Sequence, residues 1–110
     1  MAKVFLIGPT VGLPRLNIDV FVPVAEKLQR MGHEAVIPHD LFHEEENGMN
    51  GLSENEARMR MVDELLTCDA AVLLPDHHQD SFANALLFNA RKRIMNVVPV
   101  TRVSIDLKEA

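Results

Sequence analysis

Tryptophan and tyrosine are absent from this chain of 110 residues, and Cys68 is its single cysteine. The missing rings remove two of the usual stacking platforms for nucleic-acid bases and every tyrosine nucleophile or acid. One cysteine can form neither an intrachain disulfide nor a cysteine-based zinc site, which is typical of a reducing compartment. We therefore expect a cytoplasmic protein.

Long hydrophobic runs are also lacking. No apolar stretch approaches the roughly 20 residues that a membrane-spanning helix needs, and the apolar run after Lys3 is too short for a secretory leader. No membrane partner is expected. With 16 acidic against 11 basic residues, the formal net charge is −5. This charge disfavours sequence-independent binding to the phosphate backbone of a nucleic-acid polymer.

What the chain does contain is an alternation of short apolar runs and helical patterns. The expected strands and helices follow one another as 3–7, 17–31, 35–37, 53–66, 69–74, 81–95 and 97–100. This order predicts a three-layer, doubly wound α/β domain with a parallel four-stranded sheet in the flavodoxin-like order 2-1-3-4. We expect a single domain over residues 1–100 and a C-terminal tail over 101–110.

Local signals indicate where the helices begin. Ser53–Glu56 has the pattern of a capping box, and Ser81 can cap the helix at 81–95. Asn17 is a candidate N-cap of the first helix. Pro23 fits only the first turn of a helix or a kink, so that helix is expected to begin properly near residue 22.

The topology itself nominates a ligand site. In an open parallel sheet, ligands bind beyond the carboxyl ends of the strands, where the strand order reverses. With the order 2-1-3-4, the loops 8–16 (GPTVGLPRL) and 75–81 (PDHHQDS) face each other there. Gly8 and Gly12 permit close approach or positive φ, although a purely structural turn is the alternative. The first loop matches no established nucleotide-phosphate motif, so an ordinary triphosphatase or dinucleotide enzyme is not expected.

The second loop carries Asp76, His77 and Asp80 to the start of a helix, where free N–H groups and the helix dipole favour an anion such as phosphate. Ser81 could donate a hydrogen bond to the same group. In the alternative interpretation, Asp80 and Ser81 only cap the helix and the histidines are solvated. Adjacent histidines on a regular strand cannot both face one metal ion, so we expect no metal site and no other cofactor.

Three stretches of the chain resemble a known family. They are KVFLIGPTVGLPRLNIDVF at 3–21, AEKLQRMGHEAVIP at 25–38 and MVDELLTCDAAVLLPD at 61–76. They look like the small bacterial and phage-encoded relatives of nucleoside 2-deoxyribosyltransferases, with recognisable spacing as far as Pro99. The resemblance implies the same doubly wound fold and a nucleoside or nucleotide ligand. It also implies glycosyl transfer through a covalent intermediate on a glutamate.

The glutamate that the resemblance calls for is missing. The family's pattern after the third strand is roughly Ser-x-Gly-Ala-x-x-Glu, and aligning its serine with Ser81 puts Leu87 at the glutamate. Leucine can neither attack carbon nor relay a proton. Residues 81–95 contain no Asp or Glu at all, so a shift of the alignment does not restore the nucleophile.

Two functions from different classes therefore stay open, beside a purely structural or protein-binding role. One is a nucleotide- or nucleoside-binding protein that has lost glycosyl transfer and sequesters or senses a small nucleotide. The other is an active deoxyribosyltransferase or deoxynucleotide N-glycosidase that uses a displaced carboxylate, Asp76 or Asp80. Together, the topology and the resemblance nominate as ligand-binding residues Gly8, Pro9, Gly12, Leu13, Asp63, Asp76, His77, Ser81 and Asn84.

The helix expected at 81–95 is unusually apolar. Its sheet-facing stripe is predicted to consist of Ala83, Leu86, Leu87, Ala90 and Ile94, which leaves Phe82, Ala85 and Phe88 on other faces. A wide core stripe is one explanation. Self-association is the other, and we expect a homodimer or higher homo-oligomer.

The net charge is unevenly distributed. Residues 40–64 carry eight acidic and two basic side chains, whereas residues 91–102 carry four basic and no acidic ones. The acidic segment is expected to be mostly a solvated face.

Overall fold

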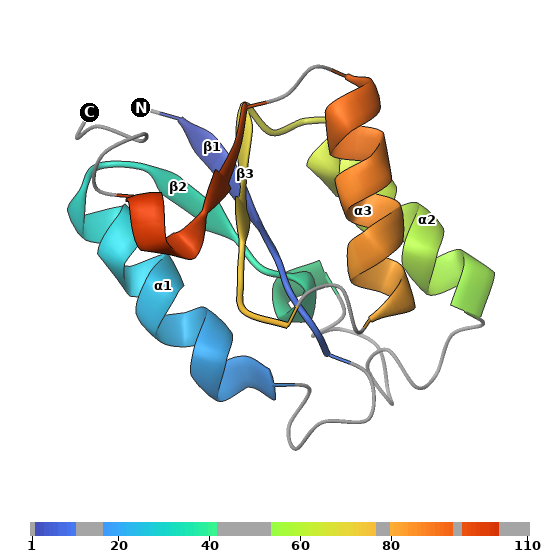
Figure 1. The fold of residues 1–110 in the computed structure, drawn as a ribbon, viewed down its shortest axis with the longest axis horizontal. Helices are drawn as coiled ribbons and strands as arrows, with labels where there is room; N and C mark the ends of the chain where they lie inside the picture. Colours follow the sequence, from blue (N-terminus) through green and yellow to red (C-terminus); the bar gives the residue numbers. More distant parts are fainter. Residues whose placement is uncertain (1, 11–16, 42–53, 77–79, 94–95, 104–110) are drawn as a thin grey trace.

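The computed structural model describes residues 2–10, 17–41, 54–76, 80–93 and 96–103 (Figure 1). Strands and helices alternate along the chain. In order they are β1 (Lys3–Ile7), α1 (Ile18–Arg30), β2 (Glu34–Val36), the 3₁₀ helix η2 (Pro38–Leu41), α2 (Glu54–Leu65), β3 (Ala70–Leu73), α3 (Ser81–Lys92), β4 (Asn96–Pro99) and the 3₁₀ helix η5 (Val100–Arg102).

The four strands form one all-parallel sheet in the order β2-β1-β3-β4, which confirms the predicted fold class and strand order. Val4 of β1 pairs with Ala35 of β2 on one side and with Ala70 of β3 on the other. The strand order therefore reverses between β1 and β3. The carboxyl ends of these two strands lie next to each other, as the expected site requires.

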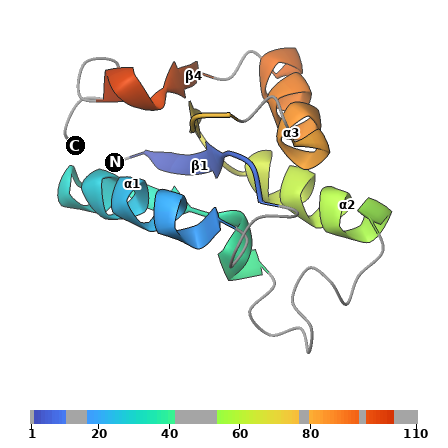
Figure 2. The same cartoon turned by 60° about the horizontal axis from the view of Figure 1, so that its bottom comes forward.

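Helices cover both faces of this sheet (Figure 1). Phe21 and Leu28 of α1 are fully buried against one face in a cluster that includes Val4 and Leu6. The intervening residue, Phe5, points into the opposite cluster, which α2 and α3 fill. Figure 2 shows α2 and α3 together on that side. Because alternate residues of β1 enter different cores, its apolar run is continuous.

The start of α1 differs from the prediction. The helix begins at Ile18, not near residue 22, and Pro23 lies inside it on the exposed side. Asn17 occupies the N-cap position with a φ of 63°, but its side chain makes no capping bond. Its Nδ2 instead donates a 3.0 Å hydrogen bond to the carbonyl oxygen of Pro9. This hydrogen bond joins the loop after β1 to the start of α1.

Two predictions about α3 are also corrected. The helix begins at Ser81 as predicted, but its N-cap is Asp80, the residue of the alternative interpretation, whose side chain accepts hydrogen bonds from the backbone of the first turn. Phe82 is not left on another face, because it is 7% exposed and belongs to the core beneath α2 and α3. Phe88, in contrast, is 67% exposed.

The chain continues to contact the sheet after β4. Val103 is almost fully buried in the cluster on the α1 side, so this residue of the expected tail belongs to the core. Ser53, the proposed first residue of the capping box, and Ile94 lie outside the described residues. None of the helices in the described part of the chain is long and apolar enough to cross a membrane.

Candidate functional site

The centre of the candidate site is the point where β1 and β3 end side by side. The N–H of Leu74 donates a 2.8 Å bond to the carbonyl of Ile7, which extends the ladder beyond β3. The next residue of the first loop, Gly8, is buried against this extension. A Cβ at Gly8 would lie 2.9 Å from the Cβ of Leu74 and 3.1 Å from Cζ of Phe21. Glycine therefore lets the chain leave β1 in close contact with its neighbours.

Asp80 joins the first loop to the start of α3. Its Oδ2 accepts a 2.8 Å hydrogen bond from the backbone N–H of Thr10. Its Oδ1 accepts bonds from the N–H groups of Phe82 and Ala83 at 2.8 and 3.1 Å. Thr10 is 1% exposed and Asp80 is 5% exposed. A buried carboxylate with both oxygens bonded to backbone amides is suited to holding two loops in register.

These hydrogen bonds use N–H groups that the expected anion site would need. The amides of Phe82 and Ala83 are among the N–H groups at a helix start that could hold a phosphate. Here they bond to the side chain of Asp80. A carboxylate that is already present also offsets the positive end of the helix dipole. The first turn of α3 therefore has less capacity for an anion than its sequence suggested.

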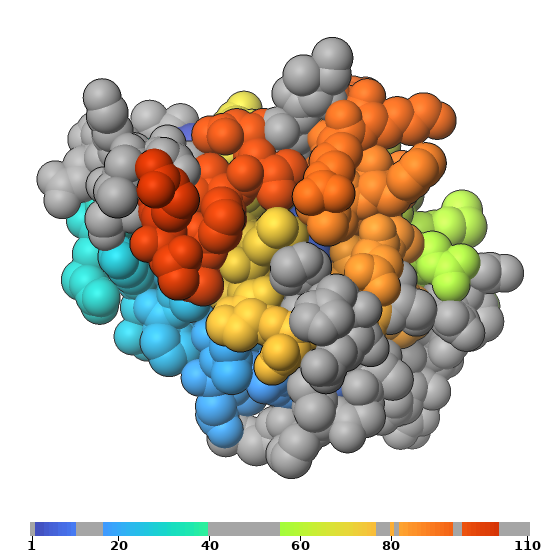
Figure 3. All heavy atoms as spheres, in the orientation of Figure 1, coloured from blue at the N-terminus to red at the C-terminus, as the bar shows by residue number. Residues whose placement is uncertain are grey.

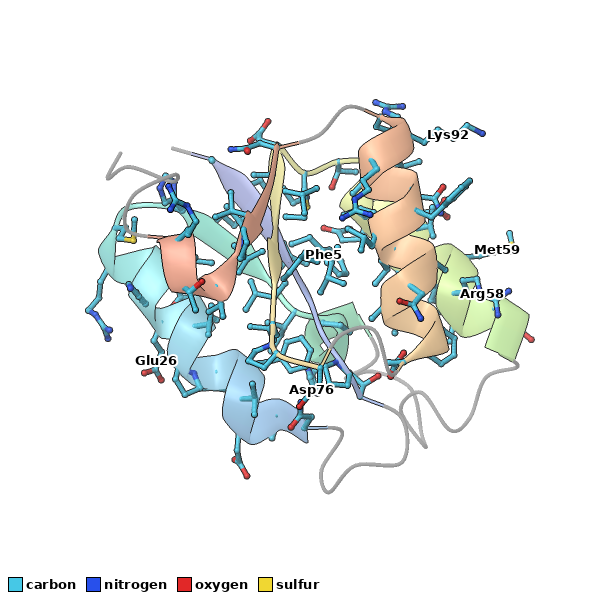
Figure 4. All side chains as sticks on the ribbon, in the orientation of Figure 1. Phe5, Glu26, Arg58, Met59, Asp76 and Lys92 are labelled. Carbon is cyan, nitrogen blue, oxygen red and sulfur yellow. The ribbon has the colours of Figure 1, made fainter. Side chains whose placement is uncertain are left out.

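Asp76 has different surroundings. It follows β3 directly, is exposed, and has a φ of 62°, in the left-handed region. Figure 4 shows Asp76 at the edge of the molecule where the strands end, near the start of α1. A side chain other than glycine in this region is uncommon, although aspartate is among the residues that tolerate it best. Asp76 is thus a carboxylate at this edge that a ligand could reach.

A hollow of about 370 Å³ opens beside Asp76, beyond the carboxyl ends of β3 and β4. Figure 3 shows the end of β3 in yellow at the surface next to β4 and η5 in red. Among the described residues, the wall is mostly apolar, with one carboxylate and one hydroxyl, and includes Leu73, Leu74, Pro75, Asp76, Pro99, Val100 and Thr101. The sequence placed the site between β1 and β3, whereas this hollow lies on the other side of β3.

The structure brings together only part of the predicted set. Gly8, Pro9, Asp76 and Asp80 lie at the carboxyl edge. Gly12, Leu13 and His77 lie outside the described residues, as does the side chain of Ser81. Asn84 is exposed in the second turn of α3.

Asp63 lies away from this edge. It is exposed in the last turn of α2, next to Glu64. The carboxylate of Glu64 forms a 2.9 Å ion pair with Nζ of Lys3, the first residue of β1. Lys3 marks the amino end of the sheet, opposite the candidate site. Asp63, nominated as a ligand-binding residue, therefore lies at the other end of the sheet from Asp76.

Sequence reasoning missed three residues at the carboxyl edge. Thr10 supplies the buried N–H for Asp80, and Asn17 bonds to Pro9. His39, in η2, stands edge-on to Phe21 with 4.9 Å between ring centroids. A backbone donor leaves no signal in a side-chain pattern, and the sequence around Asn17 predicts only a helix cap.

The described residues contain no group of three or more His, Cys, Asp or Glu side chains that could hold a metal ion.

A family profile described as a domain of unknown function, DUF4406, matches residues 2–99 and so spans all four strands. No curated protein matches the chain.

Proposed function

The chain belongs to the DUF4406 family of domains of unknown function, and we propose that this member binds a small nucleoside or nucleotide at the carboxyl edge of its sheet. The proposal depends on the position of Asp76. Its carboxylate is exposed at the mouth of an apolar hollow, and its backbone has a left-handed conformation. Unusual backbone conformations cost free energy and persist only where the surrounding structure fixes them. They are concentrated at functional sites.

The hollow supports this ligand class by its size and its wall. Its volume of about 370 Å³ is near the lower end of the roughly 300–1,000 Å³ of small-molecule sites. Leu73, Pro99 and Val100 offer an apolar surface to the face of a heterocyclic base. The carboxylate of Asp76 can accept hydrogen bonds from a base N–H or a sugar hydroxyl. A small number of polar groups in a mostly apolar wall is the usual composition of such sites.

Among such ligands, the uncharged nucleoside is favoured over its monophosphate. Asp76 and Asp80 both lie at this edge, and Asp80 already bonds two amides of the first turn of α3. A phosphate would compete with a carboxylate for these donors and would be repelled by both negative charges. We therefore expect the nucleoside to bind at least as tightly as its 5′-monophosphate.

Base release by a displaced carboxylate is the second candidate function. Asp76 is favoured over Asp80 for this role, because it is exposed beside the hollow, whereas both oxygens of Asp80 bond to backbone amides. In that reaction the carboxylate of Asp76 would attack the anomeric carbon, the base would leave with the bonding electrons and gain a proton, and water would release the sugar.

A binding and turnover experiment separates these functions. Calorimetry with a panel of nucleosides and their 5′-monophosphates measures affinity, and chromatography of the same mixtures measures released base. We expect a bound, intact nucleoside, and an affinity at least tenfold lower in Asp76→Asn. Asp63→Asn is the matched control, because it removes an exposed carboxylate at the other end of the sheet.

Each outcome has a distinct meaning. Base release by the wild-type chain that is lost in Asp76→Asn would replace the binding proposal with the catalytic one. Equal loss of affinity in Asp63→Asn would contradict the assignment of the site. A chain that binds no member of the panel would overturn the proposed function.

We also propose that the chain associates with a second copy of itself, as the apolar helix at 81–95 predicts. The exposure of Phe88, 67% of its surface, supports this. Large apolar side chains in contact with water are a cost that association removes.

A further inference from the structure

The outer surface of the α2–α3 layer carries the two most exposed large apolar side chains among the described residues. Phe88 of α3 is 67% exposed and Met59 of α2 is 64% exposed. Figure 4 shows Met59 and Lys92 pointing to the same side of the molecule, away from Phe5 in the core. This surface, with α2 and α3 side by side, is called the α2–α3 face below.

The α3 half of the face is a groove with cations at one end. The groove has a volume of about 660 Å³, and it is lined by Asn84, Leu87, Phe88, Arg91 and Lys92. The α2 half presents Glu56, Met59, Arg60 and Asp63, all exposed. Their spacing of three and four residues puts them along one face of the helix. Each half thus combines one large apolar side chain with ionic side chains.

The two halves have opposite charge. On this face α2 carries the acidic Glu56 and Asp63 against the basic Arg60, a net charge of −1, whereas Glu64 is paired with Lys3. From Ser81 to Lys92, α3 carries two basic residues and no acidic one, a net charge of +2, and Arg93 follows directly. The face therefore holds, on one molecule, both members of a complementary pair. A two-fold symmetric interface requires this property, because the same patch must contact itself.

We infer that the α2–α3 face binds the same face of a second copy, with α3 of each chain against α2 of the other. This inference rests on the proposed self-association and gives it a location. The contact would bury Met59 and Phe88 in both chains, and would bring Arg91 and Lys92 near the partner's acidic helix. Opposite charges at the rim of an interface set the relative position of the two chains, and the attraction between them weakens as the salt concentration increases.

Charge exchange tests the inference. One variant, Glu56→Lys with Asp63→Lys, makes the outer side of α2 basic. The other, Arg91→Glu with Lys92→Glu, makes the end of α3 acidic. In a dimer of either variant alone, α2 and α3 carry charges of the same sign, so both contacts between α3 of one chain and α2 of the other are repulsive. In a dimer of one variant with the other, both contacts are attractive: one has the wild-type charges, and in the other the two charges are exchanged.

Sedimentation velocity between 5 and 500 µM measures the outcome. We expect the wild-type chain to reach twice its 12.3 kDa mass, and each variant alone to associate at least tenfold more weakly. An equimolar mixture of the two is expected to recover wild-type association. Phe88→Ser is expected to weaken it at least tenfold. Circular dichroism and thermal melting verify that each variant is folded.

A matched control changes the same charges on the opposite side of the molecule. Asp19→Lys with Glu26→Lys replaces two exposed acidic residues of α1, and we expect wild-type association. A wild-type chain that stays monomeric at 500 µM would overturn both the inference and the proposed self-association, and would leave the face to a different partner. A dimer that neither exchange weakens, or that the control weakens equally, would overturn the interface alone.

Discussion

The carboxylate of Asp80 accepts a 2.8 Å hydrogen bond from the backbone N–H of Thr10, which lies 70 residues earlier in the chain. The same carboxylate caps the first turn of α3. One side chain therefore fixes the loop after β1 relative to the loop after β3. These two loops flank the point where the strand order reverses, at the same edge of the sheet as the hollow.

Replacing Asp80 by alanine is expected to lower the free energy of unfolding by about 2–4 kcal/mol. Loss of a helix cap costs about 0.5–2 kcal/mol, and leaving the buried N–H of Thr10 without its acceptor costs about 1–3 kcal/mol more. Urea unfolding followed by circular dichroism measures the change. Thr10→Ala keeps the N–H and removes a hydroxyl that is 3.5 Å from Asp80, so a loss of only about 1 kcal/mol is expected. Equal stability of the two variants would contradict the role given to the Asp80 carboxylate.

Gly8→Ala is expected to destabilise the fold by steric overlap. The added Cβ would lie 2.9 Å from both Cβ and Cδ1 of Leu74. The first of these atoms is close to the backbone of the extended β3 ladder and cannot easily move. Overpacking of this kind costs about 1–3 kcal/mol, which urea unfolding would detect. A change below about 0.5 kcal/mol, the range of an ordinary surface substitution, would show that the two strand ends separate freely.

Pro23→Ala is expected to stabilise the protein. Pro23 is exposed inside α1, where it supplies no N–H for the helical bond to the carbonyl of Asp19. An interior proline costs a helix up to about 3 kcal/mol, so a gain of about 1–3 kcal/mol is expected in the free energy of unfolding. Val22→Ala, at the adjacent exposed position, is the control and should change stability by only about 0.5 kcal/mol. A loss of stability in Pro23→Ala would mean that proline restricts the unfolded chain more than it disturbs the helix.

The sheet could be predicted from the sequence because each buried strand is a short apolar run that ends at a proline or a glycine. β1 ends before Gly8-Pro9, and β3 ends two residues before Pro75. The alternation with helical patterns then leaves few topologies, since parallel crossovers are right-handed. Local and long-range preferences agree over these segments.

The helix ends could not be predicted equally well. Asp80 and Ser81 are both good capping residues, and the acceptor that the structure uses also bonds to Thr10, which is distant in sequence. The helical period predicts Phe82 outside the sheet-facing stripe. Phe82 is nevertheless buried, because α3 packs against α2 as well as against the sheet. Contacts between helices widen the buried face beyond what one helical period indicates.

The hollow could not be predicted because its walls come from segments that the sequence treats separately. The sequence predicts Asp76 in the loop after one strand, and it predicts Pro99 and Val100 at the end of another strand. Their common edge is set by the pairing of β3 with β4, where Leu73 lies opposite Pro99. Only the register of the sheet brings these residues together.

The thiol of Cys68 is expected to react slowly with disulfide reagents while the protein is folded. Cys68 is 9% exposed, and its Sγ donates a 3.4 Å hydrogen bond to the carbonyl of Glu64. Burial raises the pKa of Cys68 from 9.0 to about 11. At pH 8 only about one thiol in a thousand is then the reactive thiolate, against about one in ten in the unfolded chain. The rate of modification should rise with pH up to about 11 in the folded protein, and should be about a hundredfold higher at pH 8 in urea.

The same pKa difference makes stability depend on pH. The folded state keeps the Cys68 proton that the unfolded state loses above about pH 9, so the free energy of unfolding should fall as the pH rises from 9 towards 11. The hydrogen bond to Glu64 also raises the pKa of Lys3 above 10.5, and its contribution is lost only as the pH rises further. Urea unfolding at pH 8 and pH 10 therefore isolates the thiol. The fall should be present in the wild-type chain and absent in Cys68→Ala, and an equal fall in both would assign the pH dependence to another group.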